Sequence, residues 1–366
     1  MKYLILLFAA CLAFSCTRHS EKDPAELLDA YFSAEFPAEG PGAAVLVMRQ
    51  GKVLFEKGYG LADLEKKTPI TPSTAFNTGS ISKTFVSNAI LMLREEGKLS
   101  LDDPLETYFP DFKNPDIAKK VKIYHLLNHS SGLADSRRVA EDSVFYLTAK
   151  DEENFAPIKQ NDTTYFEPGT RYRYSNPAFN GLALIIQQIT GKRWQDFIID
   201  RIFAPSGMTG SKITDGPYPQ TGVAHAYVWD QGKFIEDDYG EEPTFAASGN
   251  GGVWSSVRDL AKYEQALQKA VFLPTDAIQK SRTPFQPANW QDTIPAFIGY
   301  SWFTGTYQET PIVFHTGHQG GFTADYVWVP SKQFFYVILC NSPRPIEQYR
   351  EEVLKVSKLR GYEVAK

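Results

Sequence analysis

The chain contains 366 residues, of which 43% are hydrophobic and 22% are charged, and its formal net charge at pH 7 is −5. A chain of this length and composition can bury a large hydrophobic core and is long enough for two lobes. The acidic balance argues against a nucleic-acid partner, because proteins that bind nucleic acid carry a basic surface.

The N-terminus predicts export from the cell. Lys2 is followed by an apolar run at 3–14 that is shorter than the roughly 20 residues of a transmembrane helix. The residues around Cys16 resemble a relaxed bacterial lipobox, which implies a signal peptide at 1–15, a lipid on Cys16 and a lipidated tether at 16–24. We therefore expect a membrane-anchored lipoprotein in the periplasm or at the cell surface. Ordinary export with cleavage nearby is the alternative.

Cysteine and histidine usage predicts neither disulfides nor a metal site. Cys11 would leave with the signal peptide and Cys16 would be acylated, so only Cys340 remains, next to an apolar run that predicts a buried strand. The six histidines are scattered along the sequence, and no cluster has the spacing of zinc ligands. We expect no metal and no cofactor.

The segment 25–366, which we expect to form a single domain, begins with a helix and two strands. Pro24 suits the first turn of a helix. Apolar runs at 43–49 and 52–60 flank a short turn at 50–51, which is typical of two strands joined by a tight turn. A helix followed by a hairpin is therefore the expected start of the domain.

Ser80 and Lys83 form the one Ser-x-x-Lys pattern in the chain. Apolar residues recur with helical spacing in the segment 84–94 that follows, so Ser80 should lie at a helix N-terminus, where free N–H groups and the helix dipole stabilise an oxyanion. Residues three apart share a helical face, which brings the Lys83 amine beside the Ser80 hydroxyl. A lysine whose pKa is lowered by burial can serve as the base that a serine nucleophile needs. Alone, the pattern also fits a capping serine and a solvated lysine.

The middle of the chain, from about 99 to 209, predicts a helical lobe, whose outer bounds we place at about 85–245. The polar stretch at 134–165 is expected to be a loop with short turns. Apolar residues with helical spacing predict short helices at 116–120, 123–127, 178–190 and 194–203.

The last third of the chain returns to strands. A capped amphipathic helix is expected at 256–267, and a second amphipathic helix at 345–359 closes the chain. Strands at both ends of the chain, separated by helices, imply one sheet assembled from the termini. Runs rich in aromatic and β-branched residues predict strands at 299–304, 311–315, 323–329 and 334–339.

Two further motifs follow Ser80 along the chain. Tyr174 and Asn176 form the one Tyr-x-Asn pattern, between an expected turn and an expected helix. A phenol can relay a proton to a leaving group if nearby cations lower its pKa, and an amide can hold a substrate carbonyl. The triplet His-Thr-Gly at 315–317 follows a predicted strand, whose edge can pair with an extended ligand.

Taken together and in this order, the segments 80–83, 174–176 and 315–317 resemble the three motifs of the penicillin-recognising serine hydrolases. The branch is that of class C β-lactamases, D-alanyl-D-alanine carboxypeptidases, D-aminopeptidases and related esterases. The resemblance implies an α/β (α+β) fold of the β-lactamase/transpeptidase type, in which a mostly antiparallel sheet is flanked by helices and carries an inserted helical lobe. Supporting segments at 126–133, 166–170 and 248–255 look like the same family.

The resemblance also implies roles for individual residues. Ser80 would attack a carbonyl and form an acyl-enzyme, while Lys83 and Tyr174 exchange the protons. Asn176 would position the acyl side of the substrate. The backbone N–H groups of Ser80 and His318 are implied as the oxyanion hole.

The third motif departs from that of β-lactamases, which usually carry lysine at the position of His315. Histidine is largely neutral near pH 7, so the fixed positive charge that attracts a substrate carboxylate is missing. His-Thr-Gly instead resembles some carboxypeptidases and D-specific peptidases of the family. The resemblance assigns His315, Thr316 and Gly317 to substrate binding.

We therefore expect an exported serine hydrolase that acts on a D-amino-acid peptide, amide or ester. A small-acyl esterase is an alternative, because specificity would lie in loops such as 134–165. A second alternative is a sensor module that a β-lactam or peptidoglycan acylates without turnover. His125 and His129, in the expected helical lobe, are interpreted as structural.

Overall fold

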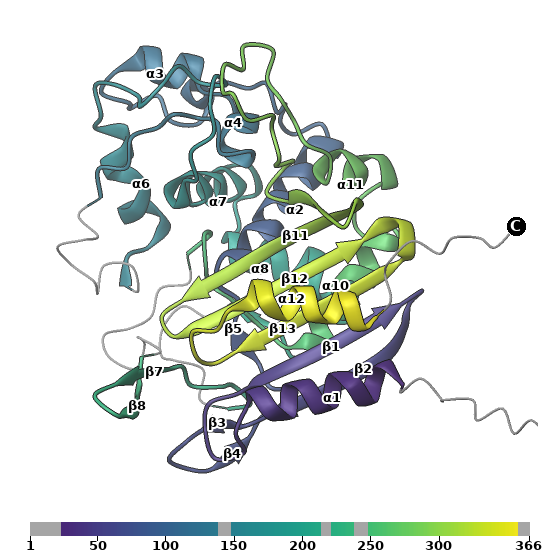
Figure 1. Ribbon diagram of the computed structural model, residues 1–366. Helices are drawn as coiled ribbons and strands as arrows, with labels where there is room; N and C mark the ends of the chain where they lie inside the picture. Colours follow the sequence, from purple (N-terminus) through teal and green to yellow (C-terminus); the bar gives the residue numbers. More distant parts are fainter. Residues whose placement is uncertain (1–22, 138–147, 214–220, 238–247, 358–366) are drawn as a thin grey trace, which may run out of the picture.

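The computed structural model describes residues 23–137, 148–213, 221–237 and 248–357 (Figure 1). The expected signal peptide and Cys16 lie outside the described residues. Within the described ranges, no helix combines the length and the apolar character needed to cross a membrane.

A six-stranded antiparallel sheet forms the centre of the molecule, in the order β10-β11-β12-β13-β1-β2. β1 near the N-terminus pairs with β13 near the C-terminus, with Ala43 opposite Cys340. The prediction of one sheet assembled from the termini is therefore confirmed. The strands are β1 (Ala43–Arg49), β2 (Lys52–Tyr59), β10 (Phe303–Tyr307), β11 (Thr310–Gln319), β12 (Phe322–Val329) and β13 (Phe334–Cys340).

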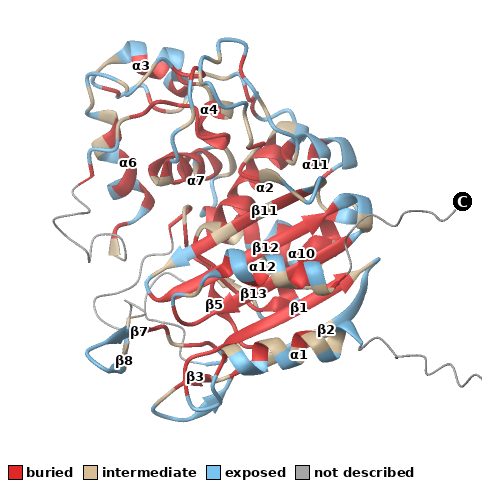
Figure 2. Ribbon diagram, in the orientation of Figure 1, coloured by how far each residue is buried: buried red, intermediate tan, exposed pale blue. Residues whose placement is uncertain are grey.

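Helices cover both faces of this sheet (Figures 1 and 2). On one face, α1 (Pro24–Glu35) and α12 (Ile346–Val356) pack side by side. On the other face lie α2 (Ser82–Glu95) and α10 (Val257–Gln268). Because successive side chains of a strand point to opposite faces, alternate residues of β1 enter two separate hydrophobic clusters, with Val45 in one and Leu46 in the other.

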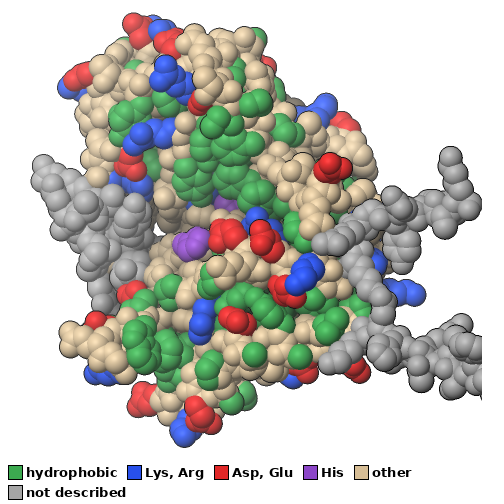
Figure 3. Space-filling view, in the orientation of Figure 1, with side chains coloured by type: hydrophobic (Ala, Val, Ile, Leu, Met, Phe, Trp, Pro, Cys, Tyr) green, Lys and Arg blue, Asp and Glu red, His purple; other side chains and the backbone are tan. Residues whose placement is uncertain are grey.

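The helical lobe lies beside the β11 side of the sheet and is packed around α7 (Figure 1). In the view of Figure 3, hydrophobic side chains gather on the surface of the lobe next to the sheet. The other elements of the lobe and its surroundings are α3 (Pro115–Lys120), α4 (Ile123–Leu127), α6 (Asp151–Lys159), α7 (Asn176–Thr190), α8 (Trp194–Ile198), α9 (Ala204–Ser206) and α11 (Thr275–Ser281).

Short strands connect the lobe to the sheet. The small sheet β5-β9-β6 leads into the segment that carries Ser80, because β5 ends at Asn77. These strands are β3 (Leu61–Asp63), β4 (Thr68–Pro69), β5 (Phe76–Asn77), β6 (Lys212–Ile213), β7 (Tyr227–Asp230), β8 (Lys233–Glu236) and β9 (Val253–Ser255).

Two sequence-based expectations about elements are wrong. The stretch 134–165 contains the helix α6, whose first turn carries three acidic side chains and whose buried contacts are partly polar. A strand does not run over 299–304, because Ser301 adopts a left-handed backbone conformation with φ of 72°, and β10 begins only at Phe303. The expected β-lactamase/transpeptidase-like fold is confirmed by the sheet and its flanking helices.

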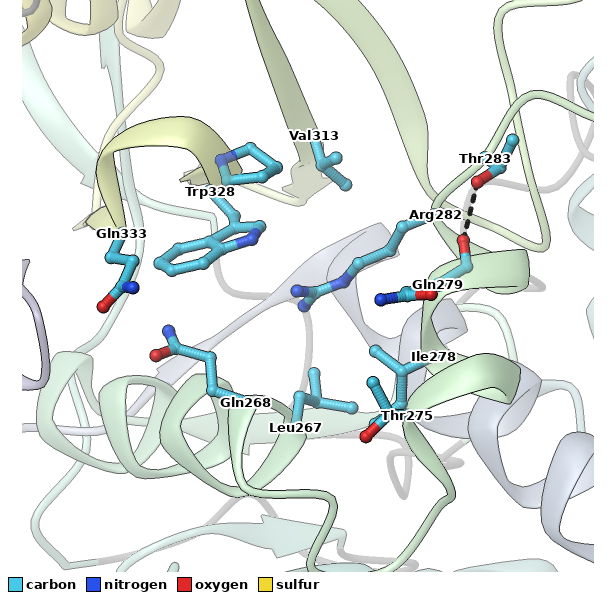
Figure 4. A pocket seen from close by; sticks show the side chains of 11 residues that line it. Leu267, Gln268, Thr275, Ile278, Gln279, Arg282, Thr283, Val313, Trp328 and Gln333 are labelled. Carbon is cyan, nitrogen blue, oxygen red and sulfur yellow. Dashed lines mark hydrogen bonds between the residues drawn. The ribbon is translucent and has the colours of Figure 1, made fainter.

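Arg282, at the end of α11, lines a cavity of about 600 Å³ (Figure 4) and forms a buried ion pair with Glu264 of α10. Arg282 donates two hydrogen bonds to the Glu264 carboxylate, with N···O distances of 2.9 and 2.6 Å. Glu264 also accepts a hydrogen bond from the Tyr326 hydroxyl of β12, and the guanidinium lies 4.6 Å from the centre of the Trp302 ring. The pair therefore joins helices to the sheet away from the motifs that carry Ser80 and Tyr174.

Replacing Arg282 with methionine should destabilise the protein by about 3–5 kcal/mol, because the Glu264 charge would remain buried without its partner. The free energy of unfolding measured in urea would show this loss. Lys280→Met is the matched control, since Lys280 lies on α11 in an exposed ion pair with Asp276 and should cost about 0–1 kcal/mol. Equal losses for the two variants would contradict the prediction.

Candidate active site

Ser80 lies in a short 3-10 helix, Gly79–Ile81, that leads directly into α2. Gly79 has a positive φ of 52°, and a Cβ there would stand 2.6 Å from the backbone nitrogen of His318. A Cβ on Gly317 would meet the Thr78 carbonyl oxygen at 2.0 Å. Both positions need glycine, because only then can the Ser80 turn pack directly on the backbone of β11.

Lys83 occupies the first turn of α2 and is completely buried. Its Nζ atom lies 2.9 Å from Ser80 Oγ and donates a hydrogen bond of 2.6 Å to the Asn250 carbonyl oxygen. Burial lowers the pKa of this amine well below its usual value, and the nearby positive charge of Arg137 lowers it further. The expected proximity of Ser80 and Lys83 is present, together with the burial that a basic lysine requires.

Tyr174 precedes the N-cap of α7 and reaches Ser80 from the helical lobe. Its ring stacks on the His129 imidazole, with a centroid distance of 4.3 Å, and Lys83 Nζ lies 5.2 Å from the ring centre. Burial raises the pKa of the Tyr174 phenol, and a hydrogen bond with the Ser80 side chain offsets part of this rise. The phenol is therefore protonated at neutral pH, and among the described residues no cation lowers its pKa in the way expected of a proton relay.

His315 faces the site from β11 and is buried. Its Nδ1 atom lies 2.7 Å from the Thr316 carbonyl oxygen, which can only accept, so Nδ1 carries the proton and Nε2 presents a lone pair. Nε2 is buried and has no hydrogen-bond partner among the residues that the structure describes. Burial and the nearby Lys83 lower the pKa of His315 to about 3, so the imidazole is neutral.

His129, interpreted from the sequence as structural, lies against the predicted catalytic residues. The backbone N–H of Ser175 donates to His129 Nδ1 at 3.1 Å, which leaves the proton on Nε2, a buried atom that no described residue accepts from. Burial, Lys83 and His315 all lower the pKa of His129. The site therefore contains two neutral imidazoles, and their contacts join segments that are distant in the sequence.

The remaining predicted residues surround Ser80 from two sides. Asn176 is the first residue of α7 and is half-buried, on the helical-lobe side. Thr316 is half-buried and His318 is exposed, both on β11. The three motifs thus meet at the junction of the lobe and the sheet, where histidine also reaches the surface in Figure 3.

Sequence reasoning did not identify Asn250 as a partner of Lys83. Asn250 belongs to the segment 248–255 that resembles the family, but the contact uses its backbone carbonyl, which no residue type reveals. Among the described residues, no group of three histidine, cysteine or acidic side chains is placed to hold a metal ion.

Comparison with known proteins identifies the same family that the three sequence motifs resemble. Residues 33–357 match the Beta-lactamase family. The chain is 27% identical over 337 residues to penicillin-binding protein 4* from Bacillus subtilis, covering 86% of this chain and 71% of that protein. It is 30% identical over 232 residues to a D-aminopeptidase from Brucella anthropi, covering 62% of this chain and 42% of that protein.

Among solved structures, the octameric penicillin-binding protein homologue from Pyrococcus abyssi superposes with a TM-score of 0.76 at 27% identity. The match covers 92% of this chain and 76% of that chain. The match to the Beta-lactamase family extends over most of the chain and includes all three motifs. The chain belongs to the beta-lactamase family of serine hydrolases.

Proposed function

We propose that this protein hydrolyses an amide, peptide or ester of a D-amino acid through an acyl intermediate on Ser80. The observation that carries the proposal is the buried Lys83 amine, 2.9 Å from the Ser80 hydroxyl oxygen. A buried amine with a lowered pKa can accept the hydroxyl proton while Ser80 attacks the carbonyl carbon. The bond to the leaving group then breaks, and water later attacks the acyl-serine to release the acid.

The backbone N–H groups of Ser80 and His318 are the proposed oxyanion hole. The close packing of Gly79 on His318 supports this role, because it brings the two backbone segments together on one side of the nucleophile. N–H groups fixed by the fold can stabilise the oxyanion without reorganising during the reaction. Asn176 and Thr316, on opposite sides of Ser80, would hold the substrate.

Tyr174 is the proposed acid for the leaving group. Its phenol is protonated at neutral pH and is hydrogen-bonded to Ser80. It can donate a proton to the departing nitrogen or oxygen and recover one from the Lys83 ammonium, so the proton taken from Ser80 returns through Tyr174. This assignment needs no positive charge beside the tyrosine.

Neutral His315 supports a substrate without a carboxylate at the reacting end. A cation at this position would attract such a carboxylate, whereas a buried neutral imidazole leaves the carboxylate desolvated and unpaired. Aromatic rings beside Tyr174 favour an apolar group, since Phe303 stacks next to Tyr174 and Phe297 next to Phe303. A D-amino-acid amide or ester fits these features, in line with the similarity to a D-aminopeptidase.

We further propose that the protein is exported and that Cys16 carries a lipid anchor. The apolar run at 3–14 and the lipobox-like residues at Cys16 support this location. A D-amino-acid substrate agrees with it, because a site outside the cytoplasm would meet cell-wall material.

The first prediction concerns covalent labelling. A fluorophosphonate should add to the wild type but not to Ser80→Ala, as measured by intact-mass spectrometry. Lys83→Arg should label at least roughly 100-fold more slowly, because a guanidinium stays protonated and cannot act as the base. The exposed Lys120→Arg is the control and should label normally.

A penicillin in the same experiment separates the alternatives. A hydrolase would either form a penicillin adduct and rapidly regenerate the free enzyme, or form no penicillin adduct while still reacting normally with the fluorophosphonate. A penicillin adduct that persists, in an enzyme that turns over no amide or ester, would instead identify the sensor module. Labelling of Ser80→Ala at the wild-type rate would refute the role of Ser80.

The second prediction concerns pH. Because the Lys83 amine must be deprotonated to act as the base, kcat/KM should rise with pH to a plateau. Tyr174 remains protonated through this range because its pKa is raised. Ester hydrolysis, corrected for the spontaneous rate, gives the profile. A decrease of kcat/KM between neutral and mildly alkaline pH would contradict the assignment of Lys83 as the base, because the active enzyme would then need a protonated group that is lost in this range.

The third prediction concerns specificity. His315→Lys should raise kcat/KM for a D-alanyl-D-alanine peptide with a free carboxylate, relative to a D-amino-acid amide, by roughly 10-fold or more. His315→Gln, which is uncharged, is the control and should leave this ratio within about twofold. Steady-state kinetics with the two substrates measures the ratio. A ratio unchanged in His315→Lys would show that charge at this position does not select the substrate.

A further inference from the structure

A buried carboxylate in the helical lobe joins four separate segments of the chain. Asp151, the first residue of α6, accepts hydrogen bonds from the backbone N–H of Gly249 at 2.8 Å and from Asn180 of α7 at 2.7 Å. Its second oxygen accepts from the indole N–H of Trp194 in α8, at 2.7 Å. The side chain is buried, so these donors provide the stabilisation that water would otherwise give.

The Gly249 turn held by Asp151 is the turn that contacts the base. Asn250 follows Gly249 directly, and its carbonyl oxygen accepts the 2.6 Å hydrogen bond from Lys83 Nζ. A Cβ on Gly249 would lie 2.7 Å from the Phe179 carbonyl oxygen of α7, so the turn is pressed against that helix. The turn is therefore held by its packing on α7, by a 3.4 Å hydrogen bond from Asn180 to the Asn250 side chain, and by the hydrogen bond to Asp151.

We propose that Asp151 is a positioning residue for catalysis, which holds the Gly249–Asn250 turn so that the Asn250 carbonyl orients the Lys83 amine toward Ser80. The inference rests on the proposed roles of Ser80 and Lys83. By accepting one N–H of the neutral amine, the carbonyl fixes the direction of the other N–H and of the lone pair. A small displacement of this acceptor turns the lone pair away from Ser80, and misplacement by about 1 Å can cost on the order of 100-fold in rate.

The carboxylate form of Asp151 is the one suited to this task. Both oxygens face donors, so the ionised group accepts all three hydrogen bonds. Burial raises the pKa of Asp151 to about 7, and the donors Asn180, Gly249 and Trp194 limit that rise. An asparagine at this position has the same shape, but its NH₂ group replaces one of the two oxygens. That group can only donate and would face another donor, so at least one of these hydrogen bonds is lost.

Asp151→Asn tests the proposal, with the rate of fluorophosphonate addition to Ser80 and the steady-state constants as readouts. We expect labelling and kcat to fall roughly 10- to 100-fold while KM stays within about twofold, because the substrate-binding groups are untouched. Asp259→Asn is the matched control. Asp259 is also buried and accepts a glycine N–H at 2.8 Å, from Gly210. None of its hydrogen bonds to described residues involves the Gly249–Asn250 turn.

Each outcome is decisive for the inference. Normal labelling of Asp151→Asn would overturn it, and so would an equal loss in Asp259→Asn, because the effect would then be general destabilisation. If Asp151→Asn does not fold, Gly249→Ala displaces the same turn from α7 and should slow labelling similarly; wild-type labelling of that variant overturns the inference. An unlabelled wild type would instead refute the proposed chemistry of Ser80 itself.

Discussion

The site depends on keeping an amine in the interior of the protein, where none of the described residues places a carboxylate in hydrogen-bond contact with it. A buried lysine is costly in its charged form, so the surroundings of Lys83 favour the neutral amine. Its Nζ contacts the Ser80 hydroxyl and the Asn250 backbone carbonyl, which form hydrogen bonds without favouring the charged form. A carboxylate at either position would raise the pKa of the amine and remove its basicity. Burial likewise disfavours the charged form of His129 and His315, so both imidazoles are neutral as well.

Close backbone packing places this amine beside a usable nucleophile. Gly79 and Gly317 allow the Ser80 turn to lie directly on β11. The buried helix α2 holds Lys83 about one helical turn after Ser80. The sheet and the helical lobe thus contribute different parts of the site. The sheet side supplies His315 and the strand edge, while the lobe supplies Tyr174, so the relative position of the two lobes fixes the site geometry.

Much of this arrangement is local and could be predicted from the sequence. The spacing of Ser80 and Lys83 on a helix determines their contact, and the alternation of β1 between two hydrophobic clusters follows from strand geometry. The helix α6 was not predicted, because Phe155 and Ile158 are its only large apolar buried side chains and buried polar contacts replace the usual apolar stripe. The environment of His129 was also not predictable, since its contacts come from segments that only the tertiary fold brings together.

The pairing of β1 with β13 has a consequence for how the chain folds. Ala43 and Cys340 lie near opposite ends of the sequence, so the centre of the sheet closes only when almost the whole chain is present. Contacts between such distant residues carry a large loop-closure entropy and slow folding. During synthesis on a ribosome, the N-terminal hairpin must wait for its central partner strand, while α6 and α7 can pack against each other earlier. Because the sheet cannot be completed before β13 has been synthesised, the growing chain stays incompletely folded. An incompletely folded chain can still pass through a narrow pore.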